Sequence, residues 1–137
     1  MNDNVHTFLP SDVPLLMRAV PKMIGLVALA TDFTTERDFA RLCLPDEVGV
    51  FVSRLVYENP TTKANLMAMG PRITDAASLI LPDYDLDVLV YACTAASVVL
   101  GQDAVVSALQ KAKPGAACVT PTSAALDAFS ALGVRDI

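Results

Sequence analysis

A cysteine stands at the point where an apolar segment of the sequence passes into a helical one. Residues 88–101 read VLVYACTAASVVLG, in which Cys93 follows the apolar run and Thr94 and Ser97 follow the cysteine. Free backbone N–H groups and the helix dipole at such a point favour a thiolate, and with the two hydroxyls they could hold a substrate carboxylate. Cys93 is therefore a candidate catalytic thiolate. The alternative is that it is a small buried apolar residue, as a cysteine in a core usually is.

Polar residues also follow other predicted strands. Thr122 and Ser123 come after the last strand and offer a second set of hydroxyl and N–H donors. Asp32 comes after the first strand and is either a base or a polar residue that precedes a helix. Because ligands bind beyond the carboxyl ends of the strands in an open parallel sheet, we expect these residues to meet at one edge. The predicted site consists of Cys93 with Asp32, Thr94, Thr122 and Ser123.

Several other chemistries are excluded by what the sequence lacks. The single histidine, His6, lies in the N-terminal segment, which argues against a histidine-dependent triad and a His-ligated metal. No glycine-rich phosphate loop is present, and the residues around Cys93 do not form a nucleophile elbow. Cys43 and Cys118 fall inside a predicted helix and a predicted strand, where buried apolar roles are expected. Three cysteines without CxxC spacing indicate neither a disulfide framework nor structural zinc, so a reducing cytosol is the expected compartment.

Strand-like and helix-like segments alternate four times along the chain. Buried strands are predicted over 24–31, 47–56, 87–93 and 116–120. Helical segments are predicted over 34–44, 58–82, 95–113 and 123–133, with breaks at Gly70–Pro71 and near Gly101, a cap at Asp103 and a glycine C-cap at Gly133. This alternation predicts an α/β fold, a four-stranded parallel sheet with helices on both faces. Residues 1–22, which contain three prolines, are predicted to be an N-terminal arm, and residues 23–133 the domain.

Composition and charge narrow the range of partners. The chain has 137 residues, enough for one domain, and 53% of them are hydrophobic, which indicates a sheet buried on both faces or an apolar surface that meets a partner. The net charge of −5 and the absence of a basic run argue against nucleic-acid binding. No apolar run reaches the ~18 residues of a membrane span, and the N-terminus lacks the basic region of a secretory signal. We therefore expect a cytoplasmic protein that binds no membrane.

Four segments of the sequence carry a resemblance to a known family. They are IGLVALATDFTTERDF, FVSRLVYENPTTKANLMAMGPRITDAASLILP, LDVLVYACTAASVVLG and VTPTSAALDAFSALGVRDI. Together they resemble the aspartate/glutamate racemase superfamily, and within it the maleate cis-trans isomerase and arylmalonate decarboxylase branch, of the ectoine-utilisation type. The resemblance extends over about residues 23–137, and DxxxYACT followed by TPxSA is its most specific part.

The resemblance implies a fold and a chemistry. Such proteins consist of two similar four-stranded α/β halves with the active site between them, and they use no cofactor or metal. One cysteine from each half faces the substrate; one removes the proton next to a carboxylate and the other returns it. In the isomerase branch the first cysteine adds to a double bond instead and allows rotation. Cys93 matches the first-half cysteine, and Thr94, Thr122 and Ser123 match positions that hold carboxylate oxygens. Asp32 stands where many members carry Asn, and an acid there would repel a carboxylate unless protonated or turned away.

The resemblance also implies that a part of the machinery is absent from this sequence. The second half with its own cysteine is missing, and residues 134–137 look like the start of its first strand. We therefore expect the N-terminal half of a cofactor-independent racemase or isomerase that acts on a small carboxylate of amino-acid or dicarboxylate type. Such a chain would depend on a second half or form a homo-oligomer. The alternative is a non-catalytic carboxylate-binding or oligomerisation module. A receiver domain is disfavoured, because Cys93 stands where it needs a phosphoacceptor aspartate.

Overall fold

The computed structural model describes residues 18 and 20–136, so that most of the predicted N-terminal arm lies outside the described residues. The core element is a sheet of four parallel strands in the order β2-β1-β3-β4. The strands are β1 (Lys22–Leu29), β2 (Val48–Leu55), β3 (Val88–Tyr91) and β4 (Ala117–Val119). The helical elements are α1 (Thr35–Leu42), α2 (Lys63–Met67), the 3-10 turn η2 (Gly70–Arg72), α3 (Ile73–Ser78), α4 (Thr94–Leu100), α5 (Gln102–Ala112) and α6 (Pro121–Ala131). The predicted α/β class and parallel sheet are confirmed.

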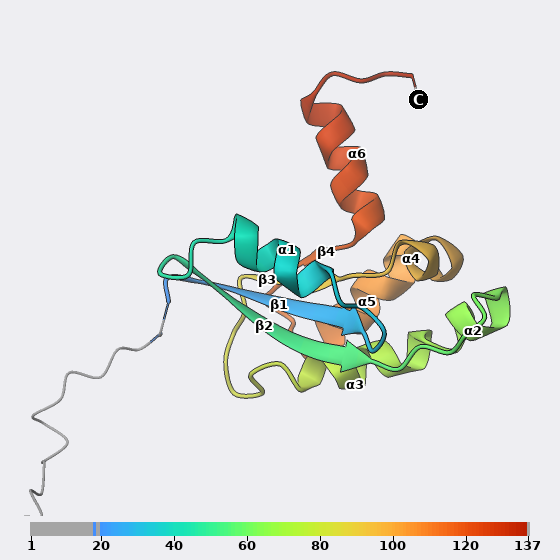
Figure 1. Cartoon of the computed structure of the whole chain (residues 1–137), viewed down its shortest axis with the longest axis horizontal. Helices are drawn as coiled ribbons and strands as arrows, with labels where there is room; N and C mark the ends of the chain where they lie inside the picture. Colours follow the sequence, from blue (N-terminus) through green and yellow to red (C-terminus); the bar gives the residue numbers. More distant parts are fainter. Residues whose placement is uncertain (1–17, 19, 137) are drawn as a thin grey trace, which may run out of the picture.

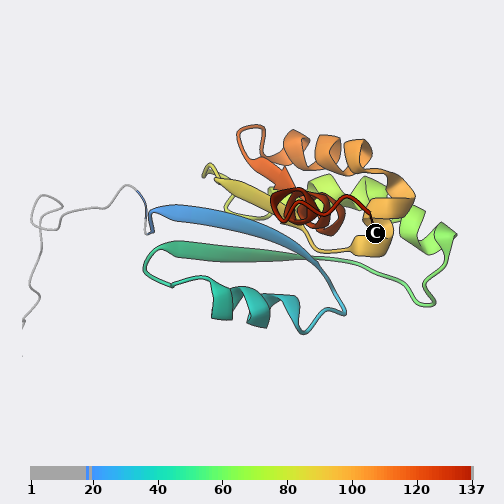
Figure 2. The same ribbon diagram turned by 90° about the horizontal axis from the view of Figure 1, so that it is seen from above.

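The main core lies between the sheet and the helices on one of its faces. Met23, Val27, Leu89 and Tyr91 point from β1 and β3 into a cluster of buried side chains that α2, α3 and α5 complete. Successive strand residues alternate between faces, so these four share one face of the sheet. Each large apolar side chain buried in this way contributes roughly 1.5–3 kcal/mol. Figures 1 and 2 show α3 and α5 on this face and α1 on the other.

The opposite face of the sheet is covered less completely. Neither α1 nor α6 has a buried residue, and α6 stands away from the sheet and is seen almost end-on in Figure 2. Several large apolar side chains on these helices, on the loops beside α1 and on edge strand β2 are exposed. These residues are Phe33, Leu42, Leu44, Val52, Leu126 and Leu132. We call the surface that they form the open side. Of the two predictions from the composition, a sheet buried on both faces or an exposed apolar surface, these side chains favour the second.

The ends of the elements show where the sequence pattern misleads. The first strand ends at Leu29 and not at residue 31, because the Asp32 amide turns back and donates to the Leu29 carbonyl (3.0 Å). The break at Gly70–Pro71 is confirmed. The cap predicted at Asp103 is wrong: Gly101, with φ +87°, precedes α5, and Asp103 lies inside its first turn.

The C-terminal end of α6 matches the prediction of a glycine cap. Gly133 has φ +69°, a conformation that glycine adopts without steric cost. The Val134 amide donates to the Phe129 carbonyl (2.9 Å) and the Gly133 amide to the Ser130 carbonyl (3.1 Å). This pair of bonds is a Schellman motif, which satisfies carbonyls that the helix leaves free.

Candidate active site

The loops that carry Asp32 and Cys93 leave the sheet at neighbouring strands. The strand order β2-β1-β3-β4 means that the chain moves from β1 to β2 on one side and then returns past β1 to β3 on the other. The loops after β1 and β3 therefore run toward opposite faces, an arrangement that favours ligand binding at the carboxyl edge of the sheet. Asp32 lies in the loop after β1, and Cys93 lies two residues after β3.

Cys93 is the residue that precedes the first turn of α4. Its backbone is extended (φ −141°, ψ 103°), and its Sγ accepts a hydrogen bond from the Ala96 amide at 3.5 Å. Its carbonyl accepts from both the amide and the hydroxyl of Ser97, at 3.0 and 2.7 Å. The side chain is only 7% exposed. The predicted junction of strand and helix is therefore confirmed, and Ser97 serves to fix the backbone of Cys93.

Thr94 is exposed and lines an open pocket of about 350 Å³ at the same edge of the sheet. The pocket lies between α1, the ends of β3 and β4, and the start of α6. Its other lining residues are Thr35, Phe39, Val90, Ala92, Val119, Thr120, Pro121 and Ala124. Cys93 is adjacent in sequence to two lining residues, Ala92 and Thr94, but does not itself line the pocket. The pocket is lined by threonines and by apolar side chains, a combination typical of sites for small organic ligands.

Thr122 and Ser123 lie in the first turn of α6, where Ser123 is already engaged. The Ser123 hydroxyl accepts from the Thr120 amide (3.0 Å), and the Thr120 hydroxyl accepts from the Ser123 amide (3.2 Å), a reciprocal capping box. The Thr120 and Thr122 hydroxyls also both donate to Oε1 of Gln102, at 2.5 and 3.2 Å. Thr122 and Ser123 line a second open pocket, of about 270 Å³, together with Gln102. The structure thus brings these two predicted residues together but puts Thr94 in a different pocket.

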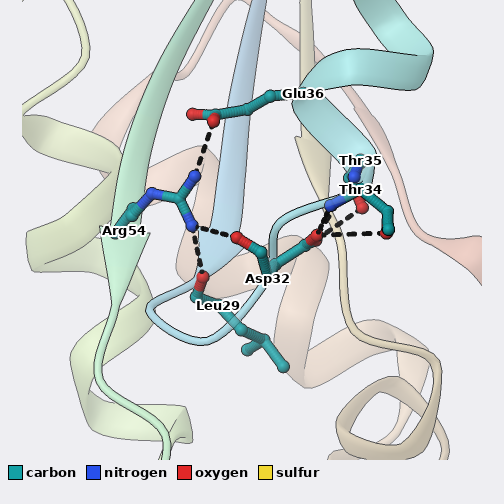
Figure 3. Close-up of polar contacts among 6 residues, drawn as sticks. All are labelled: Leu29, Asp32, Thr34, Thr35, Glu36 and Arg54. Atoms are coloured by element: carbon teal, nitrogen blue, oxygen red, sulfur yellow. Dashed lines mark hydrogen bonds and ion pairs between the residues drawn. The ribbon is translucent and has the colours of Figure 1, made fainter.

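Asp32 is turned toward the start of α1 (Figure 3). Its carboxylate accepts hydrogen bonds from the amides of Thr34 and Thr35, at 2.8 and 3.0 Å, and from the Thr35 hydroxyl at 2.5 Å. Burial alone would raise the pKa of Asp32, but the bonds from Thr35 and Thr34 outweigh it and lower the pKa to about 2. A carboxylate with so low a pKa is a weak base at neutral pH. Of the two predicted roles, the geometry favours that of a polar residue that precedes a helix.

Arg54 fixes the loop that holds Asp32. Its guanidinium donates to the carbonyls of Leu29 and Asp32, at 3.0 and 2.5 Å, and pairs with the Glu36 carboxylate at 2.5 Å. Figure 3 shows these contacts around the end of β1. Because Thr35 lines the pocket of Thr94, this network positions one wall of that pocket.

Sequence reasoning missed three residues of this edge: Thr35, Thr120 and Gln102. Thr120 had a signal, because a threonine before a proline that opens a helix is a typical N-cap. Gln102 had none, since its bond to Thr120 spans 18 positions in sequence. Among residues 18 and 20–136, no group of three or more His, Cys, Asp or Glu side chains is placed to hold a metal ion. Within the same residues, no helix is long and apolar enough to cross a bilayer.

Comparisons with known proteins reveal a structural likeness but no sequence match. No family model matches the chain, and no curated protein matches it in sequence. Among solved structures, the maleate isomerase Iso from Pseudomonas putida superposes with a TM-score of 0.65 at 22% sequence identity, over 82% of this chain and 50% of that one. The Nocardia farcinica maleate cis-trans isomerase bound to TRIS gives 0.67 at 22% identity, over 82% of this chain and 49% of that one.

A further match is a cysteine-to-serine variant of the Nocardia enzyme with a covalently bound succinylcysteine intermediate, at a TM-score of 0.64 and 20% identity. At these identities the likeness concerns the fold. The chain spans about half the length of the isomerases that it matches. The described chain therefore has the α/β fold of the maleate cis-trans isomerases over about half of their length.

Proposed function

We propose that this chain supplies one half of the active site of a cofactor-independent isomerase that acts on a small dicarboxylate of the maleate type, with Cys93 as the thiolate. The observation that carries the proposal is the place of Cys93. Cys93 follows β3 at the carboxyl edge of the sheet, and its buried sulfur accepts a hydrogen bond from the Ala96 amide in the first turn of α4. The fold likeness to maleate isomerases, one of which forms a succinylcysteine, supports the same chemistry.

The bond changes of the reaction involve a thiolate and groups that hold the carboxylates. When the sulfur adds to one alkene carbon, an S–C bond forms, the C=C π bond breaks, and its electron pair is delocalised into the carboxylate of the other carbon. The central C–C bond is then single and rotates. Loss of the thiolate returns the electron pair to the C=C bond in the trans geometry. The hydroxyls of Thr94 and Thr122 are the groups that we expect to hold the carboxylate oxygens, and Thr122 would exchange its bond to Gln102 for one to the substrate. Ser123 is held in its cap, and Asp32 is held by the start of α1.

The test compares the three thiols of the chain under alkylation by iodoacetamide. Cys93 is buried, whereas Cys43 and Cys118 are partly exposed, so exposure alone predicts that Cys93 reacts most slowly. An activated thiolate instead reacts fastest, and maleate slows its modification without affecting the other two. Peptide mass spectrometry measures the three rates in one sample, and Cys43→Ser serves as the matched control for Cys93→Ser. Rates that follow exposure and do not respond to maleate would refute the proposal.

Turnover requires, in this proposal, a second four-stranded half against the open side. The exposed apolar residues of α1 and α6, and the half-length match to the isomerases, support this requirement. We expect maleate to protect Cys93 from alkylation in the 137-residue chain alone. We expect proton NMR to detect no conversion of maleate to fumarate by this chain. Conversion by the monomeric chain would contradict the requirement for a second half.

The second candidate function is a binding or assembly module without catalysis. The observation that favours it is α6, an 11-residue helix without a buried residue that stands off the sheet. A module of this kind would form a stable dimer through the open side and bind maleate without a change in the reactivity of Cys93. Sedimentation analysis together with the alkylation rates distinguishes the two functions.

A further inference from the structure

The hydroxyl of Tyr91 is a buried polar group without a partner. Tyr91 ends β3 and is 0% exposed, and within residues 18 and 20–136 no hydrogen-bond partner meets its hydroxyl oxygen. A buried hydroxyl usually has a partner, because an unpaired one loses its hydrogen bonds to water without replacement. Among the described residues, the Tyr91 hydroxyl is the only fully buried side-chain nitrogen or oxygen atom that has no hydrogen-bond partner, so it needs an explanation.

The nearest polar side-chain group to Tyr91 along the chain is the thiol of Cys93. The two residues are separated by one position along an extended backbone, so their side chains point to the same side, and both belong to the same buried cluster. The pKa of Tyr91 is raised, first by burial and then by the charge and hydrogen-bonding capacity of the Cys93 sulfur. Lys113, the one charged side chain that is buried in the described structure, donates to three carbonyls of residues 81–84 instead.

We propose that Tyr91 is a positioning residue for Cys93: its hydroxyl donates a hydrogen bond to the sulfur when the thiolate forms, which selects the ionised form and fixes its direction. A neutral thiol is a weak acceptor, whereas a thiolate is a strong one, so the bond is realised only in the reactive state. The energy otherwise lost by the unpaired hydroxyl is recovered when the thiol ionises. This inference deepens the proposed function and rests on it for its catalytic meaning, but the pairing itself needs no substrate.

The test is the pH profile of Cys93 alkylation by iodoacetamide in the full chain and in its Tyr91→Phe variant. Loss of the hydroxyl is expected to move the profile about one pH unit higher and to slow Cys93 alkylation about tenfold at neutral pH. Cys43 and Cys118 in the same molecules are expected to keep their rates. Tyr84→Phe, which removes a hydroxyl from an exposed tyrosine, is the matched control and is expected to leave all three rates unchanged.

Two further measurements test the proposal if iodoacetamide alkylates Cys93 too slowly to measure or if the Tyr91→Phe variant does not fold. The ¹³Cβ resonance of Cys93, assigned against a Cys93→Ala spectrum, reports ionisation without any reagent and is expected to move by the same amount. Incorporation of 3-fluorotyrosine makes the phenol a stronger donor without changing the fold, and is expected to move the profile in the opposite direction. A Tyr91→Phe profile that coincides with that of the wild type would overturn the proposal.

The failure of this inference can be separated from the failure of the proposed function. If maleate does not protect Cys93 but Tyr91→Phe still moves the pH profile, the dicarboxylate function is wrong and the Tyr91–Cys93 pairing stands. If maleate protects Cys93 and the profile of Tyr91→Phe is unchanged, the function stands and the pairing is wrong.

Discussion

Asp32→Asn is the substitution that most directly tests the account of the loop after β1. The asparagine keeps an oxygen that can accept from the Thr34 and Thr35 amides but removes the charge. The fall in the pKa of Asp32 from 3.8 to about 2 corresponds to about 2.5 kcal/mol of stability if it is fully retained. Because the carboxylate is partly exposed, solvent screening reduces the expected loss in the variant to about 1 kcal/mol at pH 7.

The pH dependence gives this prediction its sign. A carboxylate whose pKa is lower in the folded state stabilises the fold above its unfolded pKa, and the contribution is lost as the pH falls through the folded value. The advantage of the wild type over Asp32→Asn should therefore be constant above about pH 5 and decline between about pH 4 and pH 2. Urea unfolding followed by far-UV circular dichroism measures it, with Asp46→Asn, an exposed loop aspartate, as the control. A variant as stable as the wild type at pH 7, or a difference independent of pH, would refute the reasoning.

Three other substitutions test contacts elsewhere in the fold. Lys113→Met keeps the apolar stem but removes an ammonium that donates to three carbonyls; we expect a loss of about 2 kcal/mol in urea unfolding. Gly101→Ala meets no atom within 4 Å, yet φ +87° should cost about 1–2 kcal/mol through backbone strain alone, and an unchanged melting temperature would contradict this. Arg54→Leu removes the clamp on Leu29, Asp32 and Glu36; about 1 kcal/mol of stability and faster proteolysis of the loop after β1 are the expected results.

The order and type of the elements follow from the sequence because they depend on local patterns. Unbroken apolar runs mark the strands, the break at Gly70–Pro71 separates two helices, and the end of the run before Cys93 places the thiol at a junction. These features need no knowledge of distant residues. The arrangement of the site is different, because it depends on which groups meet after folding.

Two contacts show why the site could be predicted only in part. The carboxylate of Asp32 is an equally good acceptor for the amides of α1 and for a distant donor, and only the turn after Leu29 decides between them. Gln102 reaches the Thr120 and Thr122 hydroxyls across a gap between α5 and α6 that no periodicity encodes. The roles that we predicted for Thr94, Thr122 and Ser123 toward a carboxylate stay predictions.

Helix α6 has a consequence for the dynamics of the chain. It is held at its start by the capping box of Thr120 and Ser123 and at its end by the turn at Gly133, but no residue along its length is buried. Segments with so little burial open locally at a small fraction of the free energy of global unfolding, whereas a central strand such as β1 opens only with the whole domain. The amides of α6 should therefore exchange with deuterium far faster than those of β1. Any partner that covers the open side would slow this exchange. The exchange rate of the α6 amides therefore measures whether a partner is bound.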